Sequence, residues 1–539
     1  MKFFPGEGWS KQPCLPRPGA VKFPYTWPPN IPINRGSIMK NQIAMGALAL
    51  TLWTCGVLYA LDATSAAPLG VKDVEAVMPL TGETLQLYVN GIYYKGETPN
   101  QTLSRFGVFG TDEGYPVLAG NQIIFFFGDT LSALREHGEF VRYIGNRGED
   151  SIAYMPNQNM ATCHYIPGLI QQMEAGNHHP TPDTSGCPAL QFYTNAAHGP
   201  SLPPFQPIII NGLTAEEGTG PSETPVGTFY HSGYLYMFYS DVIQSSAQRG
   251  SNFHLQTILA KSTQPLANWS ARNPPVFTKL YVASSHPPIV DPGSPPNDVT
   301  DTGKFIRPAP LVFSHSSLVS NSMLNGLPQE LQNAQEVIFL FGTSWKNNSN
   351  MYLAAVDAAN VEKGTGAWWY LTNAKGGAEG WSHDEKAAVP LLANFALARV
   401  PWVGEHGIIW SEDLHKFILL YTHHRGAPTG GVVGRFSSLP WGPWSEEVAI
   451  LGNQDTLAKQ IYHHEGDPIT SNNALWYGPR GKQPVRIDDH GAGPYGPFFT
   501  GQYNANKDGS VTYYFTLSPF VPYEVFLMRA TFCRTTNCQ

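Results

Sequence analysis

The stretch QIIFFFGDTL at residues 122–131 decides which fold is predicted, because four other stretches of the chain have the same pattern of residue types. Each is a run of aromatic and branched apolar residues that ends in small or polar residues, which is typical of a buried β-strand. The four counterparts are GYLYMFYSDV at 233–242, EVIFLFGTSW at 336–345, KFILLYTHHR at 416–425 and SVTYYFTLSP at 510–519. Five copies of one strand pattern predict a repeat architecture.

Each copy has apolar neighbours in the sequence. The segment before it opens with polar residues, and turn residues separate the two segments at 119–121, 231–233, 411–413 and 507–509, which predicts a hairpin. A third apolar stretch follows at 151–155, 256–262, 351–357, 432–437 and 524–532. Each unit therefore contains three or more expected strands.

Five such units predict an all-β fold, a five-bladed β-propeller with long loop insertions, over residues 106–539. A β-sandwich or jelly roll also has many short strands. It does not predict five similar units spread from about residue 100 to residue 532. The Pro- and Gly-rich stretches 156–207 and 282–302 are expected to be long loops between blades.

The pattern of residue types before residue 68 predicts a signal for export. Residues 1–38 show no periodicity and are interpreted as a disordered leader or a mis-called start. Residues 39–67 combine a basic start, an apolar run and small residues, which predicts a signal peptide and a secreted or periplasmic protein. The apolar run at 43–61 is nearly long enough to span a bilayer, so an uncleaved membrane anchor is the alternative. Residues 68–105 are expected to lead into the propeller.

The composition excludes some partners. Only 14% of the residues are charged, the formal net charge is −8, and Lys and Arg form no run. A nucleic-acid partner is therefore not expected. We also expect no cofactor, no metal and no stable membrane insertion once the signal is cleaved. Abundant Gly, Pro and aromatic residues suit strands, turns and sugar-binding surfaces.

Four cysteines follow the expected signal, and an even number in an exported chain favours two disulfides. Proximity in sequence favours Cys163 with Cys187 and Cys533 with Cys538, although four cysteines allow three connectivities. A zinc site is the other interpretation, but the chain has no C-x-x-C spacing.

The first strand of each unit should begin, and the second should end, on the same rim of the propeller. The expected openings are Asp112, Glu223, Arg307, Glu405 and Tyr495, and the closings include Asp129, Asp241, Trp345, His423 and Ser518. Paired carboxylates, one protonated and one ionised, are what glycoside hydrolysis requires. The alternative for Asp112 and Asp129 is that they only cap turns.

At these residues the sequence resembles a family. GTDEG at 110–114, FGDT at 127–130, GE at 404–405 and YYFTLSPFVPYEVFLMR at 513–529 resemble the domain-of-unknown-function propeller family DUF4185, which includes endo-D-arabinanases. The resemblance covers roughly residues 106–532 and implies a five-bladed propeller whose rim carboxylates act on a furanose polymer. The chain departs from the family in having Glu405-His406-Gly407 where Glu-x-Ser is expected, and in its cysteine-bearing insertion.

The resemblance and the rim positions together give the candidate site. Asp112, Asp129 and Glu405 are the expected catalytic acids, with Glu405 acting as the proton donor or as a neighbour that tunes the others. The expected substrate-binding residues are Glu223, Arg307, Trp345, His423, Trp476 and Tyr495. The leading hypothesis is a secreted glycoside hydrolase that cleaves an arabinofuranose-containing, D-arabinan-like polysaccharide or glycan. The alternative is a non-catalytic carbohydrate-binding propeller, a lectin or adhesion module.

Overall fold

The structure is a computed structural model of the 539-residue chain. It describes residues 68–136, 139–142, 149–194, 205–214, 224–244, 253–270, 273–289, 303–344, 349–373, 376–377, 379–392, 403–423, 431–452, 495–519, 523–534 and 538. The expected leader and signal, residues 1–67, lie outside them. Among the helices of the described residues, none has the length and apolar character needed to cross a membrane.

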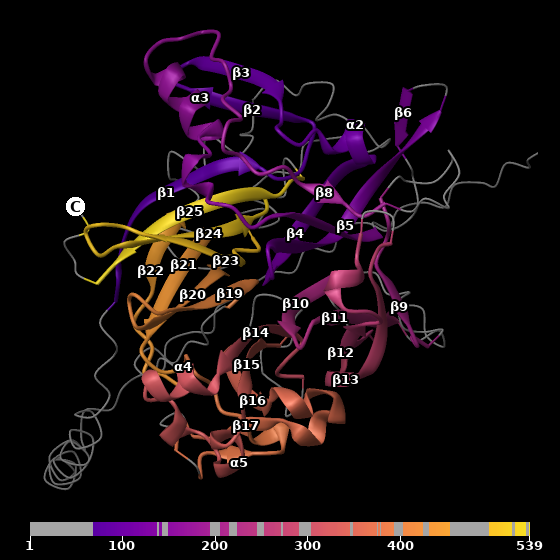
Figure 1. The fold of residues 1–539 in the computed structure, drawn as a ribbon, viewed down its shortest axis with the longest axis vertical. Helices are drawn as coiled ribbons and strands as arrows, with labels where there is room; N and C mark the ends of the chain where they lie inside the picture. The colour runs from indigo at the N-terminus through magenta and orange to yellow at the C-terminus, as the bar shows by residue number, and fades with distance from the viewer. Residues whose placement is uncertain are drawn as a thin grey trace, which may run out of the picture. The chain divides into compact units, whose positions relative to one another are not determined.

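The chain forms five blades, as the repeat predicts, and their successive strands pair antiparallel (Figure 1). Blade 1 contains β4 (Val108–Ala119), β5 (Gln122–Glu136), β7 (Glu149–Pro156) and β8 (Gln191–Phe192), and β6 (Glu139–Arg142) pairs with β5. Blade 2 contains β10 (Thr224–His231), β11 (Tyr234–Gln244), β12 (Phe253–Ser262), β13 (Val276–Ile289) and β9 (Ile209–Asn211), which pairs parallel to β13.

The remaining blades follow the same order from the inside outward. Blade 3 contains β14 (Arg307–Ser314), β15 (Glu336–Thr343), β16 (Met351–Asp357), β17 (Trp369–Leu371) and β18 (Trp381–Ser382). Blade 4 contains β19 (His406–Ser411), β20 (Lys416–His423), β21 (Gly431–Ser437) and β22 (Val448–Gly452). Blade 5 contains β23 (Phe499–Ala505), β24 (Val511–Leu517), β25 (Phe526–Cys533) and, as its outer strand, β1 (Gly70–Pro79).

The innermost strands are the ones predicted from the sequence. β4, β10, β14, β19 and β23 contact one another in ring order and together line a central cavity. Because β1 pairs with β25, the N-terminal segment closes the ring with the last blade. The five-bladed propeller is therefore confirmed.

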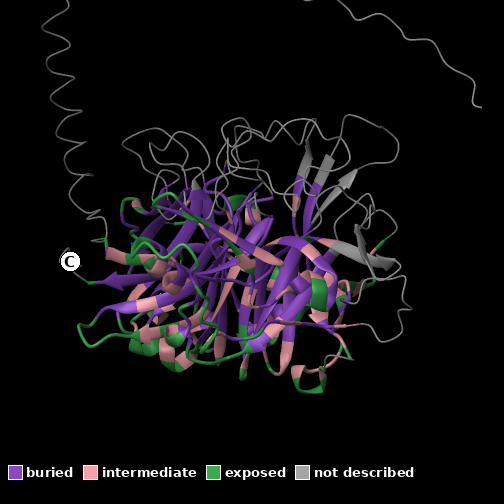
Figure 2. Cartoon of the chain, turned by 90° about the horizontal axis from the view of Figure 1, so that it is seen from above, coloured by how far each residue is buried: buried purple, intermediate pink, exposed green. Residues whose placement is uncertain are grey.

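The repeated apolar strands are apolar on both faces because each lies between two hydrophobic clusters. In β5, Phe125 and Phe127 pack into the cluster shared with blade 5, while Ile124 and Phe126 pack into the cluster shared with blade 2. Successive side chains point to opposite faces of a strand, so a continuous apolar run fills both. Full burial of each such side chain contributes ~1.5–3 kcal/mol. Figure 2 shows the resulting buried blades.

The remaining elements are not part of the five blade sheets. The hairpin of β2 (Thr84–Val89) and β3 (Ile92–Glu97) forms a separate two-stranded sheet. The four α-helices of the described residues are α2 (Thr102–Phe106), α3 (Tyr165–Glu174), α4 (His315–Ser320) and α5 (Gln329–Gln332).

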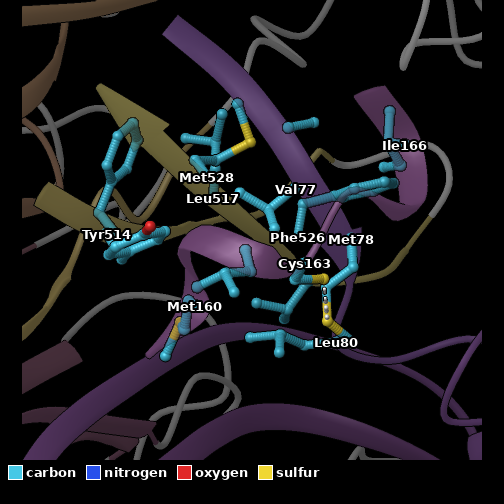
Figure 3. Packing of buried hydrophobic residues seen from close by; sticks show 14 of the residues in the cluster. Val77, Met78, Leu80, Met160, Cys163, Ile166, Tyr514, Leu517, Phe526 and Met528 are labelled. Atoms are coloured by element: carbon cyan, nitrogen blue, oxygen red, sulfur yellow. Dashed lines mark hydrogen bonds between the residues drawn. The ribbon is translucent and has the colours of Figure 1, made fainter. Parts of the chain in front are cut away.

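The predicted disulfides are both present: Cys163 pairs with Cys187, and Cys533 pairs with Cys538. The first closes the insertion that carries α3. In Figure 3, the disulfide-bonded Cys163 lies against Met78, and both belong to the same cluster as Ile166 of α3 and Phe526 of β25. The disulfide loop thus anchors the insertion to the N-terminal strand and the last blade.

Candidate active site

Carboxylates gather where the innermost strands begin. Two consecutive acids, Asp112 and Glu113, lie near the start of β4, where the pairing with β5 is interrupted by register shifts. Glu113 has a φ of 61°, a conformation that is uncommon for a residue with a side chain. A β-bulge re-aims side chains that would otherwise alternate. Both acids can therefore interact with the same neighbouring groups.

The deepest part of the site is a buried ion-pair network. Nη1 of Arg307 donates to Oε1 of Glu405 at 2.9 Å and to Oε1 of Glu113 at 3.4 Å. All three side chains are buried. They come from blades 1, 3 and 4, so the network ties three blades together at the channel.

Threonine hydroxyls complete this network. Oγ1 of Thr224, in blade 2, donates to Oε2 of Glu113 at 2.5 Å. Oγ1 of Thr422 donates to Oε2 of Glu405 at 3.4 Å. Burial raises the pKa of Glu113 to about 7, although Arg307 and the Thr224 hydroxyl act in the opposite direction. Burial alone would lower the pKa of Arg307, but Glu405 and Glu113 raise it, so the guanidinium stays charged.

Asp112 forms the second part of the site. The phenol of Tyr495 donates to Oδ2 of Asp112 at 2.8 Å, and Tyr523 also hydrogen-bonds this carboxyl. Burial raises the pKa of Asp112 well above its usual range, and the charges of Glu113 and Asp129 raise it further. The two tyrosine hydroxyls counteract this effect by stabilising the carboxylate. The net effect is a raised pKa, so burial favours the protonated form of Asp112.

Asp129 lies beside Asp112 but is exposed. It follows Gly128, the residue of β5 that pairs with Asp112, and its charge contributes to the raised pKa of Asp112. Its φ is 41°, and its backbone N–H donates to Oδ1 of Asp150 at 3.1 Å. A buried acid with a raised pKa beside an exposed acid is the combination on which glycoside hydrolysis depends.

The rim of blade 1 carries a third aspartate, Asp150, at the start of β7. Asp150 is buried, and burial raises its pKa well above its usual range, with a further contribution from Asp129. Tyr239 of blade 2 hydrogen-bonds its side chain. Asp150 holds the backbone of Asp129 and so supports the unusual conformation of that residue.

The central cavity lies further along the strands than the carboxylates. It has a volume of about 320 Å³. Its walls come from residues 115–118, 227–230, 309–312, 406–409 and 498–501, and they include no Asp or Glu. The acids begin the innermost strands, so the cavity belongs to the other end of the channel. We take the carboxylate cluster, and not the cavity, as the candidate active site, because chemistry requires the acids.

His406 lines the cavity and also lies close enough to Arg307 and Glu405 to feel their charges. Its Nδ1 lies 3.2 Å from the carbonyl oxygen of Gly404 and its Nε2 lies 3.1 Å from that of Phe341. Burial lowers the pKa of His406. The side chain is thus held by the backbone of blades 3 and 4 and lies next to Glu405 in sequence.

The structure brings together Asp112, Asp129, Arg307, Glu405 and Tyr495 of the expected site residues. Glu223, Trp345 and Trp476 lie outside the described residues, and His423 is described only in its backbone at the end of β20. Within the described residues, no group of three His, Cys, Asp or Glu side chains is arranged to hold a metal ion.

Sequence reasoning missed three residues of the cluster, Glu113, Asp150 and Tyr523. If side chains alternated strictly along β4, Glu113 and Asp112 would point to opposite faces of the sheet. The β-bulges in β4 break this alternation. Asp150 and Tyr523 lie at or just before the start of the third strand of a blade, which runs in the same direction as the first strand. The third strand therefore begins on the same rim as the first. The residues that open the third strands could have been included among the candidate site residues.

Residues 307–529 match the model of the domain of unknown function DUF4185. The chain carries a DUF4185 domain. The matched range runs from Arg307 in blade 3 to Arg529 in blade 5, and it includes Glu405, Tyr495 and Tyr523 of the cluster. A search of curated protein sequences finds no match to the chain.

Solved glycosidase structures show a distant similarity to this chain. A GH43 protein from Bacillus licheniformis is 9% identical, with a TM-score of 0.30, over 78% of this chain and 52% of that protein. An exo-β-1,3-galactanase from Phanerochaete chrysosporium is 10% identical, with a TM-score of 0.31, over 83% and 63%. An exo-1,5-α-L-arabinanase from a bovine ruminal metagenomic library is 10% identical, with a TM-score of 0.29, over 78% and 93%.

The chain spans 52% and 63% of the length of the first two of these proteins. At such identities and TM-scores, the five-blade assignment rests on the sheet topology of the chain itself.

Proposed function

We propose that this protein is a glycoside hydrolase that cleaves arabinofuranose-containing, D-arabinan-like polysaccharides or glycans. One observation carries the proposal: Asp112, whose pKa is raised by burial, lies beside the exposed Asp129 on the rim of blade 1. Hydrolysis of a glycosidic bond requires a proton donor and a carboxylate that activates water or attacks the sugar. The two aspartates meet these opposite requirements through their different environments.

In the proposed mechanism, Asp112 donates its proton to the oxygen of the glycosidic bond. Tyr495 and Tyr523 orient its carboxyl through their hydroxyl groups. Asp129 is ionised and acts on the anomeric carbon, either directly or through water. Asp150 fixes the backbone of Asp129 and so fixes the direction from which it acts.

Arg307 and the two glutamates form the base of the proposed site. Because Arg307 donates hydrogen bonds to both Glu405 and Glu113, its positive charge offsets the negative charge that these two glutamates present to Asp112. The sequence left two roles open for Glu405, proton donor or a neighbour that tunes the other acids. We assign the tuning role to Glu405 and the role of proton donor to Asp112. The network positions the reacting acids and does not exchange protons with substrate in this scheme.

The substrate class rests on the resemblance to endo-D-arabinanases and on the DUF4185 match over blades 3–5. Export, proposed from the signal-like residues 39–67, would bring the enzyme to extracellular glycans. The two disulfides suit an oxidising compartment.

The test is to incubate the purified protein with D-arabinan, L-arabinan, β-1,3-galactan and xylan and to analyse released oligosaccharides. Release from D-arabinan that exceeds release from the other polymers supports the proposal. Retention of a polymer without release of any product would favour the non-catalytic carbohydrate-binding propeller. Release only from xylan or galactan would retain the hydrolase and reject the substrate class.

A further inference from the structure

An exposed tyrosine pair lies on the β2–β3 hairpin, outside the five blades. One face of the hairpin is buried: Leu85, Leu87, Val89, Ile92 and Tyr94 belong to the hydrophobic cluster of blades 1, 4 and 5. On the other face, Tyr88 is 55% exposed and Tyr93 is 41% exposed. Large exposed aromatic side chains that occur together, and not singly, indicate a contact surface.

The backbone places these two rings side by side. Tyr88 and Tyr93 are directly opposite in the antiparallel register, one step from the turn formed by Asn90 and Gly91. Both turn residues have positive φ, which matches the tight turns that join twisted strands. Cβ atoms of directly opposite residues lie ~4.5–5.5 Å apart, so the two rings form one platform.

Polar groups border the platform. The phenol of Tyr93 donates to Oε1 of Gln86 at 2.5 Å, which fixes this ring. Lys95 is opposite Gln86, and Glu97 is opposite Thr84. The face therefore presents two aromatic rings, amide and hydroxyl groups, one cation and one anion, without a net charge.

The base of the hairpin is connected to the candidate active site. The backbone N–H groups of Leu80 and Thr81 donate to the carbonyl oxygen of Val525, at 2.7 and 3.3 Å. Two residues earlier, the carbonyl oxygen of Tyr523 accepts from Thr111, the neighbour of Asp112. One short segment thus lies between the hairpin base and the start of the strand that carries Asp112.

We propose that the Tyr88–Tyr93 platform is a second binding surface for the neutral polysaccharide, distinct from the carboxylate cluster. The inference rests on the proposed function, because the same polymer is the occupant. Sugar rings stack their apolar C–H faces on aromatic rings while their hydroxyl groups bond to amides and charged groups at the edge. A neutral polymer matches a face that has rings, hydrogen-bonding groups and no net charge.

A second copy of the chain is a poorer occupant. The outward face of the hairpin offers six residues, three from each strand. A stable protein–protein interface uses ~20–30 residues from each side. A polysaccharide chain needs only a narrow platform and gains affinity by contacting the platform and the carboxylate site at once.

The experiment is affinity electrophoresis in gels that contain D-arabinan, L-arabinan, β-1,3-galactan or xylan. It compares the full-length protein with the variant Tyr88→Ser/Tyr93→Ser, both in the Asp112→Asn background so that the polymer is not consumed. Tyr503→Ser is the matched control, because Tyr503 is 50% exposed on β23 and the tyrosine opposite it, Tyr513, is buried, so this hairpin offers a single exposed ring. We expect the double variant to weaken retardation at least ~tenfold and the control to leave it unchanged.

A parallel assay separates the two proposals. With Asp112 intact, the double variant should keep its rate on a short oligosaccharide from the retarding polymer and lose rate on the polymer itself. Equal retardation of the double variant and the parent overturns the platform, whether or not the enzyme hydrolyses the polymer. Absence of retardation of the parent in every gel also overturns it. Retardation that depends on the tyrosines, without any hydrolysis, upholds the platform and rejects the proposed function.

Discussion

Replacing Arg307 with Met tests the ion-pair network at the base of the site. Met has a similar length and no charge, so the substitution leaves Glu113 and Glu405 buried without their shared cation. Breaking a buried pair by removing one partner costs ~3–5 kcal/mol of unfolding free energy. Arg307 also lowers the pKa of Glu113, so this pKa rises further in the variant. A carboxyl whose pKa is higher in the folded than in the unfolded state stabilises the protein at low pH and loses that contribution as pH rises.

The assay is urea-induced unfolding at pH 5 and pH 8, followed by circular dichroism. We expect the loss at pH 8 to be ~3–5 kcal/mol and the loss at pH 5 to be smaller, because Glu113, whose pKa is raised by burial, then binds a proton. Adding Glu113→Gln and Glu405→Gln to Arg307→Met should recover much of the loss. Arg529→Met is the control, since its pair with Glu75 is more exposed and contributes ~0–1 kcal/mol. A loss below ~1 kcal/mol, equal at both pH values, would refute the reasoning.

Three further changes test other parts of the structure. Burial raises the pKa of Glu524 to about 8, above its ordinary 4.5, so its stabilising contribution is lost as pH rises from about 4.5 through 8. Glu524→Gln should therefore reduce the fall in melting temperature between pH 5 and pH 9, and an unchanged fall would contradict the assignment. Replacing Cys163 and Cys187 with Ser should cost ~3 kcal/mol in urea unfolding, given a loop of this size, and a cost near zero would show that the loop is not constrained by the disulfide. Tyr495→Phe removes a hydroxyl that lowers the pKa of Asp112, so the alkaline limb of the pH–rate profile for hydrolysis should move to higher pH, and a shift to lower pH would exclude Asp112 as the proton donor.

Much of the fold could be predicted because the repeated strands are local and redundant. Phe125, Phe126 and Phe127 form an apolar run that only a strand buried on both faces accommodates, and four similar runs repeat the signal. The contribution of β1 to blade 5 was not predicted. Its pairing with β25 joins residues more than 440 positions apart, and no local pattern encodes such a partner.

The site was predictable where it followed regular strand geometry. Asp112, Arg307, Glu405 and Tyr495 lie at strand openings, and the register brings them together. Glu113 was missed because its position depends on bulges and a positive φ, which alternation does not reveal. Its partners Arg307 and Thr224 come from other blades, so the ion pair and the pKa of about 7 exist only in the folded chain.

The central claim is that Asp112 and Asp129 catalyse hydrolysis together. The most direct measurement is the turnover rate on D-arabinan of Asp112→Asn and Asp129→Asn, with Asp413→Asn as control because Asp413 is an exposed turn residue between β19 and β20. Asn keeps the shape and the turn preference of Asp but cannot exchange a proton. We predict a fall of at least ~10²-fold for each of the first two variants, unchanged melting temperatures, and no change in turnover for the control. Near-normal hydrolysis by both Asp112→Asn and Asp129→Asn, or a fall in melting temperature without a fall in turnover, would contradict the claim.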